Sequence, residues 1–188
     1  MAQYTFDGRL AYTRGVREAT DIETIKAMLP GCRNVVKTEI AQDKTGIDYV
    51  ATLRHGGQVC IDAKTRVAGA SRWWKKEPEL ALETWSVMPD GKYSTPYGIS
   101  KIGWTLSERT EVDLILYTFD QKDSDVAYLL SFQMLRTAFV HNRKEWAARY
   151  KVGKQDSFRW ESEAIFVPAS IVLQAIMDAS CGIVVRME

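Results

Sequence analysis

The sequence is poor in the residues that build disulfide and zinc sites. Its three cysteines, Cys32, Cys60 and Cys181, lie far apart and form no CxxC pair, and its two histidines, His55 and His141, are also widely separated. A disulfide framework needs paired cysteines, and a zinc hydrolase needs several imidazoles or thiolates close together. We therefore expect inert thiols in a reducing cytosol and a mechanism that uses neither a zinc site nor a metal held by histidines.

Long apolar runs and an excess of one charge are also missing. The N-terminal segment lacks the apolar stretch of a signal peptide, and no run approaches the roughly 20 residues that span a bilayer. With 25 basic and 24 acidic side chains the formal net charge is +1, so any nucleic-acid-binding surface must be a local patch. These absences predict a cytoplasmic protein with no membrane partner.

The composition and the order of elements predict an α/β fold. The chain has 188 residues, of which 46% are hydrophobic and 26% charged, and this suits one globular domain over residues 1–188. We expect helices near 14–29, 125–150 and 169–179. We expect strands near 35–40, 47–53, 58–65, 80–87, 112–119 and 162–167. This order favours a mixed central β-sheet flanked by helices over a βαβ nucleotide-binding array.

Two acidic residues and a lysine lie on a predicted β-hairpin. Residues 54–57, Arg-His-Gly-Gly, are typical of the turn between two strands. Because alternate side chains of a strand point to opposite faces, Asp62 and Lys64 share one face. The other face is then apolar: Val59, Ile61 and Ala63. A turn centred on residues 54–57 pairs strand positions whose residue numbers sum to about 110 to 113. This pairing places Asp48 opposite or diagonal to Asp62 and Lys64.

This arrangement predicts a magnesium site. Two carboxylates and an ammonium on a largely buried hairpin are costly unless they serve one another or a metal. Mg²⁺ or Mn²⁺ prefers oxygen ligands and keeps several waters, so Asp48, Asp62 and the carbonyl of Ala63 would suffice as ligands. The metal would polarise a phosphodiester oxygen and lower the pKa of a water molecule. Lys64 would orient or help to deprotonate that water and offset the charge of the transition state.

The same residues resemble a known family. Asp48, thirteen intervening residues and then Asp62-Ala63-Lys64 resemble the D…(D/E)xK core of the PD-(D/E)XK phosphodiesterases, which include restriction endonucleases, resolvases and phage exonucleases. Similarity to small phage and prophage members extends to further segments: 46–49, 61–66, 82–86, 103–104 and 166–168. The resemblance covers about residues 20 to 175. It implies a restriction-endonuclease-like core and a Mg²⁺-dependent deoxyribonuclease that binds nucleic acid, DNA above all, with a homodimer suited to cutting both strands.

The resemblance leaves a further acidic ligand open. Many members of the family contribute an acid from the first helix, and both Glu18 and Asp21 qualify here. Glu18 shares a helical stripe with apolar residues, and Asp21 lies beside that stripe. The apolar members of the stripe are Ile22, Ile25 and Leu29. Glu83, on the strand after the motif, is a third candidate.

Several other segments have two interpretations. Residues 72–76, Arg-Trp-Trp-Lys-Lys, suit either a loop that stacks on bases or a solvated turn. Basic residues follow the long predicted helix: Arg136, Arg143, Lys144, Arg149 and Lys151. They suit a phosphate-binding face, although a plain solvated helix face is the favoured interpretation. The tail 177–188 suits a strand or a partner-facing segment.

A rival function and a structural interpretation stay open beside the nuclease. The rival is a non-cleaving protein that keeps the nuclease fold, such as a phage-encoded inhibitor or adaptor that binds nucleic acid or a host protein. The structural interpretation of Asp48, Asp62 and Lys64 is a solvent-facing hairpin with a cross-strand ion pair. The form of the substrate, DNA or RNA and end or interior, is also open.

Overall fold

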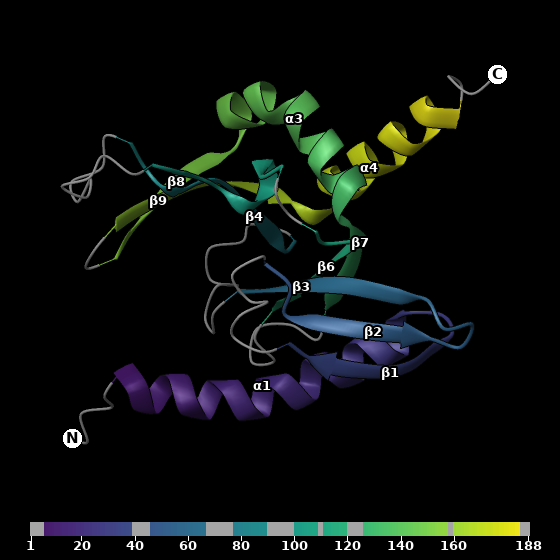
Figure 1. Ribbon diagram of the computed structural model, residues 1–188. Helices are drawn as coiled ribbons and strands as arrows, with labels where there is room; N and C mark the ends of the chain where they lie inside the picture. Colours follow the sequence, from purple (N-terminus) through teal and green to yellow (C-terminus); the bar gives the residue numbers. More distant parts are fainter. Residues whose placement is uncertain are drawn as a thin grey trace. The chain divides into compact units, whose positions relative to one another are not determined.

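The computed structural model describes residues 6–38, 46–66, 77–89, 100–108, 111–119, 126–157 and 160–184 (Figure 1). Its contacts divide the chain into two compact units. The first unit comprises Met1–Val67 and Glu111–Leu130, and the second comprises Ala68–Thr110 and Ser131–Glu188. Within the described ranges, no helix has the length and apolar character needed to cross a membrane. The single domain expected over residues 1–188 stays a prediction.

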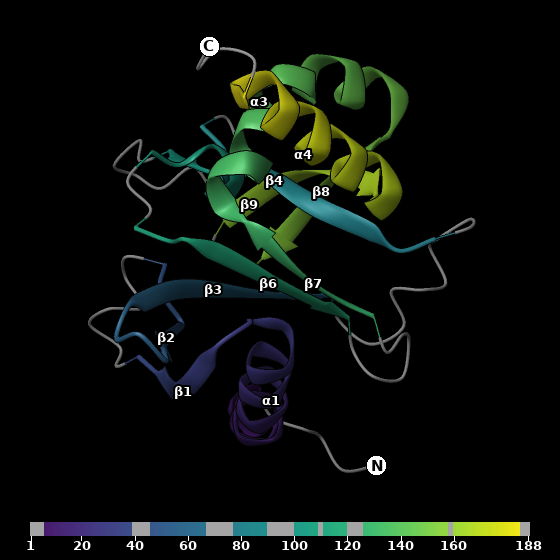
Figure 2. The same cartoon turned by 90° about the vertical axis from the view of Figure 1, so that its right-hand side faces the viewer.

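The first unit is a five-stranded sheet with one helix. It contains α1 (Phe6–Met28), β1 (Cys32–Lys37), β2 (Tyr49–Leu53), β3 (Gln58–Arg66), β6 (Leu114–Phe119) and β7 (Ala127–Ser131). The strand order is β1-β2-β3-β6-β7. The pairs β1–β2 and β2–β3 are antiparallel and β3–β6 is parallel, so this sheet is mixed, as the sequence predicted. Helix α1 packs against one face of it (Figure 2).

The core of the first unit lies between α1 and the sheet. Ile25 of α1 is fully buried against residues of four strands: Val35, Tyr49, Ala51, Ile61 and Leu116. Ile22 and Leu29 pack at the edge of this cluster, which confirms the apolar stripe predicted on the first helix. Full burial of an aliphatic side chain contributes about 1.5–3 kcal/mol. Hydrophobic burial therefore fixes which face of the sheet α1 covers.

The β2–β3 hairpin has the register that the sequence predicted. Tyr49 pairs with Ile61 and Val50 with Cys60, so the numbers of paired residues sum to 110. The turn is closed by a hydrogen bond of 2.8 Å from the Leu53 N–H to the Gly57 carbonyl. Gly56 has φ 88°, a conformation that only glycine adopts without strain. His55 is exposed at the tip, as expected.

The second unit is an antiparallel sheet with two helices. It contains β4 (Glu79–Val87), β5 (Lys101–Ile102), the 3₁₀ turn η2 (Trp104–Leu106), α3 (Phe132–Arg149), β8 (Lys151–Ser157), β9 (Trp160–Pro168) and α4 (Ala169–Val184). The strand order is β5-β4-β9-β8. Alternate residues of β4 and β9 are buried: Leu80, Leu82, Ile165 and Val167. Helices α3 and α4 pack on each other and on this sheet (Figure 2).

The predicted helix over 125–150 is wrong at its start. Residues 127–131 form β7 beside β6, and the helix begins at Phe132. The Ser131 hydroxyl accepts a hydrogen bond of 3.5 Å from the Met134 N–H and so caps the helix there. Pairing with a neighbouring strand has overridden a helical spacing of apolar residues that continued upstream of the cap. Position 125 lies outside the described residues.

The expectation of one central sheet is also corrected. The strands predicted at 80–87 and 162–167 exist as β4 and β9, but they pair with each other in the second, antiparallel sheet. Strand β8 was not predicted, because its sequence, Lys-Val-Gly-Lys-Gln-Asp-Ser, has no alternation of apolar residues. The α/β class is confirmed, and the restriction-endonuclease-like arrangement stays a prediction.

Candidate functional site

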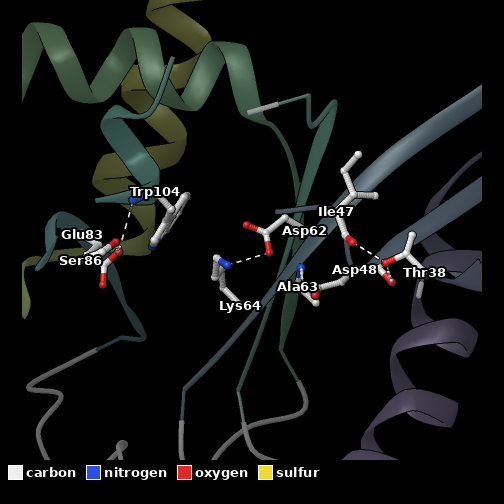
Figure 3. Close-up of polar contacts among 9 residues, drawn as sticks. All are labelled: Thr38, Ile47, Asp48, Asp62, Ala63, Lys64, Glu83, Ser86 and Trp104. Carbon is white, nitrogen blue, oxygen red and sulfur yellow. Dashed lines mark hydrogen bonds and ion pairs between the residues drawn. The ribbon is translucent and has the colours of Figure 1, made fainter. Parts of the chain in front are cut away.

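The β2–β3 hairpin brings the three predicted site residues together. Asp62 and Lys64 lie two residues apart on β3, and the Lys64 ammonium donates to Asp62 Oδ1 at 2.7 Å (Figure 3). The Asp62 side chain is 5% exposed and that of Lys64 is 31% exposed. Ile61, with Val59 and Ala63 beside it, packs on the α1 side of the sheet. The predicted alternation along β3 is therefore confirmed, with a charged pair on the face opposite the helix.

Asp48 is held at the start of β2 by β3. Its backbone N–H donates to the Ile61 carbonyl at 2.9 Å, and its carboxylate Oδ2 accepts from the Ala63 N–H at 2.8 Å (Figure 3). On its other side, the Asp48 carbonyl accepts from the Thr38 N–H at 2.9 Å. The carboxylate thus replaces a backbone acceptor at the point where regular β2–β3 pairing ends. These contacts fix the Asp48 side chain next to the peptide that follows Asp62.

The Asp62 carboxyl has a strongly raised pKa. Burial raises this pKa most, and a hydrogen bond to Asp48 and the negative charge of Asp48 also raise it, to about 7 once the opposing effect of Lys64 is included. The Lys64 ammonium and its hydrogen bond act in the opposite direction. Because burial dominates, Asp62 carries a proton part of the time near neutral pH. The lysine alone does not compensate for two acids held side by side in this environment.

Of the two acids proposed from the first helix, Asp21 is the one coupled to Asp48. Asp21 is buried and accepts a hydrogen bond of 3.1 Å from the Tyr49 hydroxyl. Burial raises the pKa of Asp21, and the charge of Asp48 raises it further, while the Tyr49 hydrogen bond lowers it. Glu18 instead makes an ion pair of 3.1 Å with Lys37, in which both side chains are 39% exposed. Tyr49 had not been singled out from the sequence; its only signal was its place next to Asp48 on the apolar face.

Glu83 has a different set of partners within the second unit. Its Oε2 accepts from the Ser86 hydroxyl at 2.6 Å and from the Trp104 N–H at 3.3 Å (Figure 3). Next to Trp104, a Cβ at Gly103 would lie 2.2 Å from the Glu83 carbonyl oxygen, so only glycine allows η2 to approach β4 this closely. The Glu83 carboxylate therefore has a structural role in holding η2 on β4.

The described acids do not form a three-ligand metal cluster. Among the residues that the structure describes, no group of three or more His, Cys, Asp or Glu side chains is arranged to hold a metal ion. Asp21, Asp48 and Asp62 are thus linked by charge without converging on one point. A cation at this hairpin would have two side-chain ligands, completed by a backbone carbonyl and water.

The basic segments that were considered for nucleic-acid binding have different outcomes. Residues 72–76 lie outside the described part of the chain. Arg149 of α3 pairs with Glu145 at 3.7 Å, and Lys151 of β8 lies 5.6 Å from the centre of the Phe166 ring. Arg136, Arg143 and Lys144 line a groove in the second unit. The five basic residues therefore do not act as one face.

Comparison with known proteins identifies no relative. No protein-family model, no curated protein and no solved structure matches the chain. The resemblance to the PD-(D/E)XK phosphodiesterases therefore stays a prediction from the sequence.

Proposed function

We propose that this protein is a Mg²⁺-dependent nuclease that hydrolyses phosphodiester bonds of DNA, with Asp48, Asp62 and Lys64 as its catalytic residues. The observation that carries the proposal is the state of Asp62. Its carboxyl group is buried beside a second carboxylate, and its pKa is raised to about 7 even with a lysine at 2.7 Å. Two acids that are costly to hold together gain a compensating charge when a divalent cation binds.

The donor atoms suit Mg²⁺. Asp48 binds the Ala63 N–H through Oδ2 and Asp62 binds Lys64 through Oδ1, and the two carboxyl groups also share a hydrogen bond that a bound cation would replace. The N–H and carbonyl of one strand residue leave the strand on the same side, so the Ala63 carbonyl faces the edge at which Asp48 lies. Two carboxylates and a carbonyl are oxygen ligands that Mg²⁺ accepts together with several waters.

Each of the proposed catalytic residues would have its own role beside the cation. When bound, Mg²⁺ would supply Lewis-acid polarisation of the phosphodiester and a more acidic water molecule. Asp48, fixed by its Ala63 contact, would hold one side of the cation in place. Lys64 lowers the pKa of Asp62 against the effect of burial, and its partly exposed ammonium can also offset the negative charge that grows on the phosphate oxygens. These groups contact only the nucleic-acid backbone, so they would give no sequence preference by themselves.

The test is cleavage of linear and circular DNA with Mg²⁺ or Mn²⁺. Wild type is compared with Asp62→Asn and Lys64→Ala, and with the matched controls Glu18→Gln and Lys37→Ala, whose ion pair is exposed. We expect the two site variants to fold and to lose about 10²-fold or more of the rate, as for other groups that stabilise charge in the transition state. The controls should keep full activity. Cleavage that survives in folded Asp62→Asn would refute the assignment, and cutting of circles would identify an endonuclease.

One observation favours the rival, a non-cleaving binding protein. The Ala63 N–H and the Lys64 ammonium account for one oxygen of each carboxylate without any metal, and the described residues include no three-ligand cluster. Thermal unfolding separates the two functions. A nuclease should gain stability with Mg²⁺ and lose that gain in Asp62→Asn. A binding protein should bind nucleic acid or a protein partner with no metal-dependent shift and no cleavage.

A further inference from the structure

The second unit contains a groove with a volume of about 800 Å³. Helix α3 forms one side of it through Arg136, Val140 and Arg143. Trp85 of β4 and Ile102 of β5 contribute to the rest of its lining. The lining residues that the structure describes all belong to the second unit, and the hairpin that carries Asp48 and Asp62 is not among them.

The lining of this groove carries an excess of positive charge. Arg136, Arg143 and Lys144 line it, together with His141, and among the described residues that line it Glu108 is the only acidic one. The Glu108 side chain is 85% exposed and pairs with Arg136 at 2.9 Å. An exposed ion pair of this kind is weak, so an anionic ligand can replace Glu108 as the partner of Arg136. The net charge of the whole chain is only +1, which makes this local excess informative about the ligand.

The groove also presents apolar surface next to these cations. Ile102 is 52% exposed and Val140 is 49% exposed, and the Trp85 side chain is half-buried. A ligand that carried charge alone would leave this surface in water. Phosphates joined to flat, apolar bases match both parts of the lining.

The basic residues in and after α3 fall into two groups, those that line the groove and those that do not. Residues 136, 140, 143 and 144 have the spacing of one helix face, and all of them line the groove. Arg149 and Lys151, on the same helix end and the strand that follows, interact with Glu145 and Phe166 and do not line it. Arg143 and Lys144 are exposed, in agreement with the favoured expectation of a solvated face, and they line the groove as well.

We propose that this groove binds a single strand of nucleic acid, with Arg136, Arg143 and Lys144 on the phosphates and the bases against Trp85 and the exposed apolar side chains. A duplex hides its bases, and an acidic peptide offers no flat apolar rings, so a single strand uses the lining most fully. The inference rests on the proposed function in so far as it names the form of the substrate. Binding itself needs neither the metal nor cleavage.

The test is fluorescence anisotropy of the full chain in EDTA, where a Mg²⁺-dependent nuclease does not cut. The probes are a labelled oligothymidylate, an abasic oligomer of the same length, a duplex of the same length and a polyglutamate peptide. The variant Arg143→Gln/Lys144→Gln removes two charges from the groove. Its matched control, Arg149→Gln/Lys151→Gln, removes two charges nearby. Glu108→Gln is matched in the same way by Glu145→Gln.

We expect the oligothymidylate to bind more tightly than the other three probes. The groove variant should bind it about tenfold or more weakly and should reduce the slope of log K against log salt by about 1.4, since each lost phosphate contact with a single strand accounts for about 0.7. The matched control should leave that slope unchanged. Glu108→Gln should tighten binding by a factor of about 2 to 5, because it removes the competing anion, and Glu145→Gln should not.

Three results would each overturn the proposal. One is an equal loss of oligothymidylate affinity in the two double variants, another is equal binding of the abasic oligomer, and the third is a preference for the duplex or the polyglutamate peptide.

The failures of the two proposals are distinguishable. If the oligothymidylate binds as expected but Mg²⁺ produces no cleavage, the groove stands and the nuclease fails. If DNA is cut while the groove variant binds and cuts like wild type, the nuclease stands and the groove fails.

Discussion

Replacing Asp62 by asparagine should stabilise the metal-free protein. The Asp62 carboxyl has its pKa raised from 3.8 to about 7, mainly by burial. At ~1.4 kcal/mol for each pKa unit, holding this group ionised in the folded state costs up to ~4 kcal/mol. Asparagine has the shape of the protonated acid. Its Oδ1 can accept from Lys64, and its amide can donate to Asp48. We expect a gain in the free energy of unfolding on the order of 2 kcal/mol at pH 8.5, below this upper limit because the site relaxes around the charge.

The sign of the effect depends on pH. An acid whose pKa is higher in the folded state binds more protons there than in the unfolded chain, so wild-type stability falls as pH rises from about 4 to about 7 and the cost is complete above that range. Asp62→Asn has no carboxyl group to ionise at this position and so lacks this pH-dependent cost. Its advantage over wild type should therefore be largest above pH 7 and should shrink toward pH 4.

The assay is urea unfolding in EDTA at pH 4.5, 7 and 8.5, with Glu18→Gln as a control for loss of one exposed carboxylate. Removing one member of a buried ion pair ordinarily destabilises a protein by about 3–5 kcal/mol, which is the opposite sign. If Asp62→Asn is less stable than wild type at pH 8.5, the Asp62–Lys64 pair is a net stabilising contact. The two carboxylates would then need no cation, and this basis for a metal site would be refuted.

Metal binding, pH and two side chains of the first unit provide four further tests. Mg²⁺ should raise the melting temperature of wild type and not that of Asp48→Asn, measured by differential scanning fluorimetry. Cleavage at subsaturating Mg²⁺ should rise with pH up to about 7, where Asp62 ionises, and the profile should be measured from initial rates. Tyr49→Phe should lower the free energy of unfolding by about 1–3 kcal/mol, because it leaves the buried Asp21 without its hydroxyl donor. Ile25→Ala should cost about 2–5 kcal/mol in urea, since Ile25 is fully buried under α1.

The hairpin and its charged face were predictable because their signals are local. A glycine turn and an alternating strand determine the register, and the register determines that Asp62 and Lys64 share a face. The contact between the Asp48 carboxylate and the Ala63 N–H was not predictable. The contact forms because regular β2–β3 pairing ends at Tyr49, and no pattern of residues in the sequence indicates that end point.

The choice between Glu18 and Asp21 needed the structure because helical spacing alone treats them as neighbours. Contacts with other strands separate them: Tyr49 on β2 binds Asp21, and Lys37 on β1 binds Glu18. The division of the strands into two sheets was missed for a similar reason. Propensity and alternation indicate that β4 and β9 exist, but the partner of each strand is set by tertiary packing.

The parallel pairing of β3 with β6 has a consequence for how the site assembles. Asp62 pairs with Ile115, 53 positions later in the sequence, and residues 68–110 between them belong to the second unit. Closing a loop of that length costs about 3.5 kcal/mol of chain entropy before any contact compensates for it. The antiparallel strands β1, β2 and β3 are joined by short connections and can pair first, so Lys64 meets Asp62 before β6 arrives beside them. The surroundings of Asp62 are therefore complete only after the costlier β3–β6 pairing has formed, although Asp62 and Lys64 lie in the hairpin that can pair first.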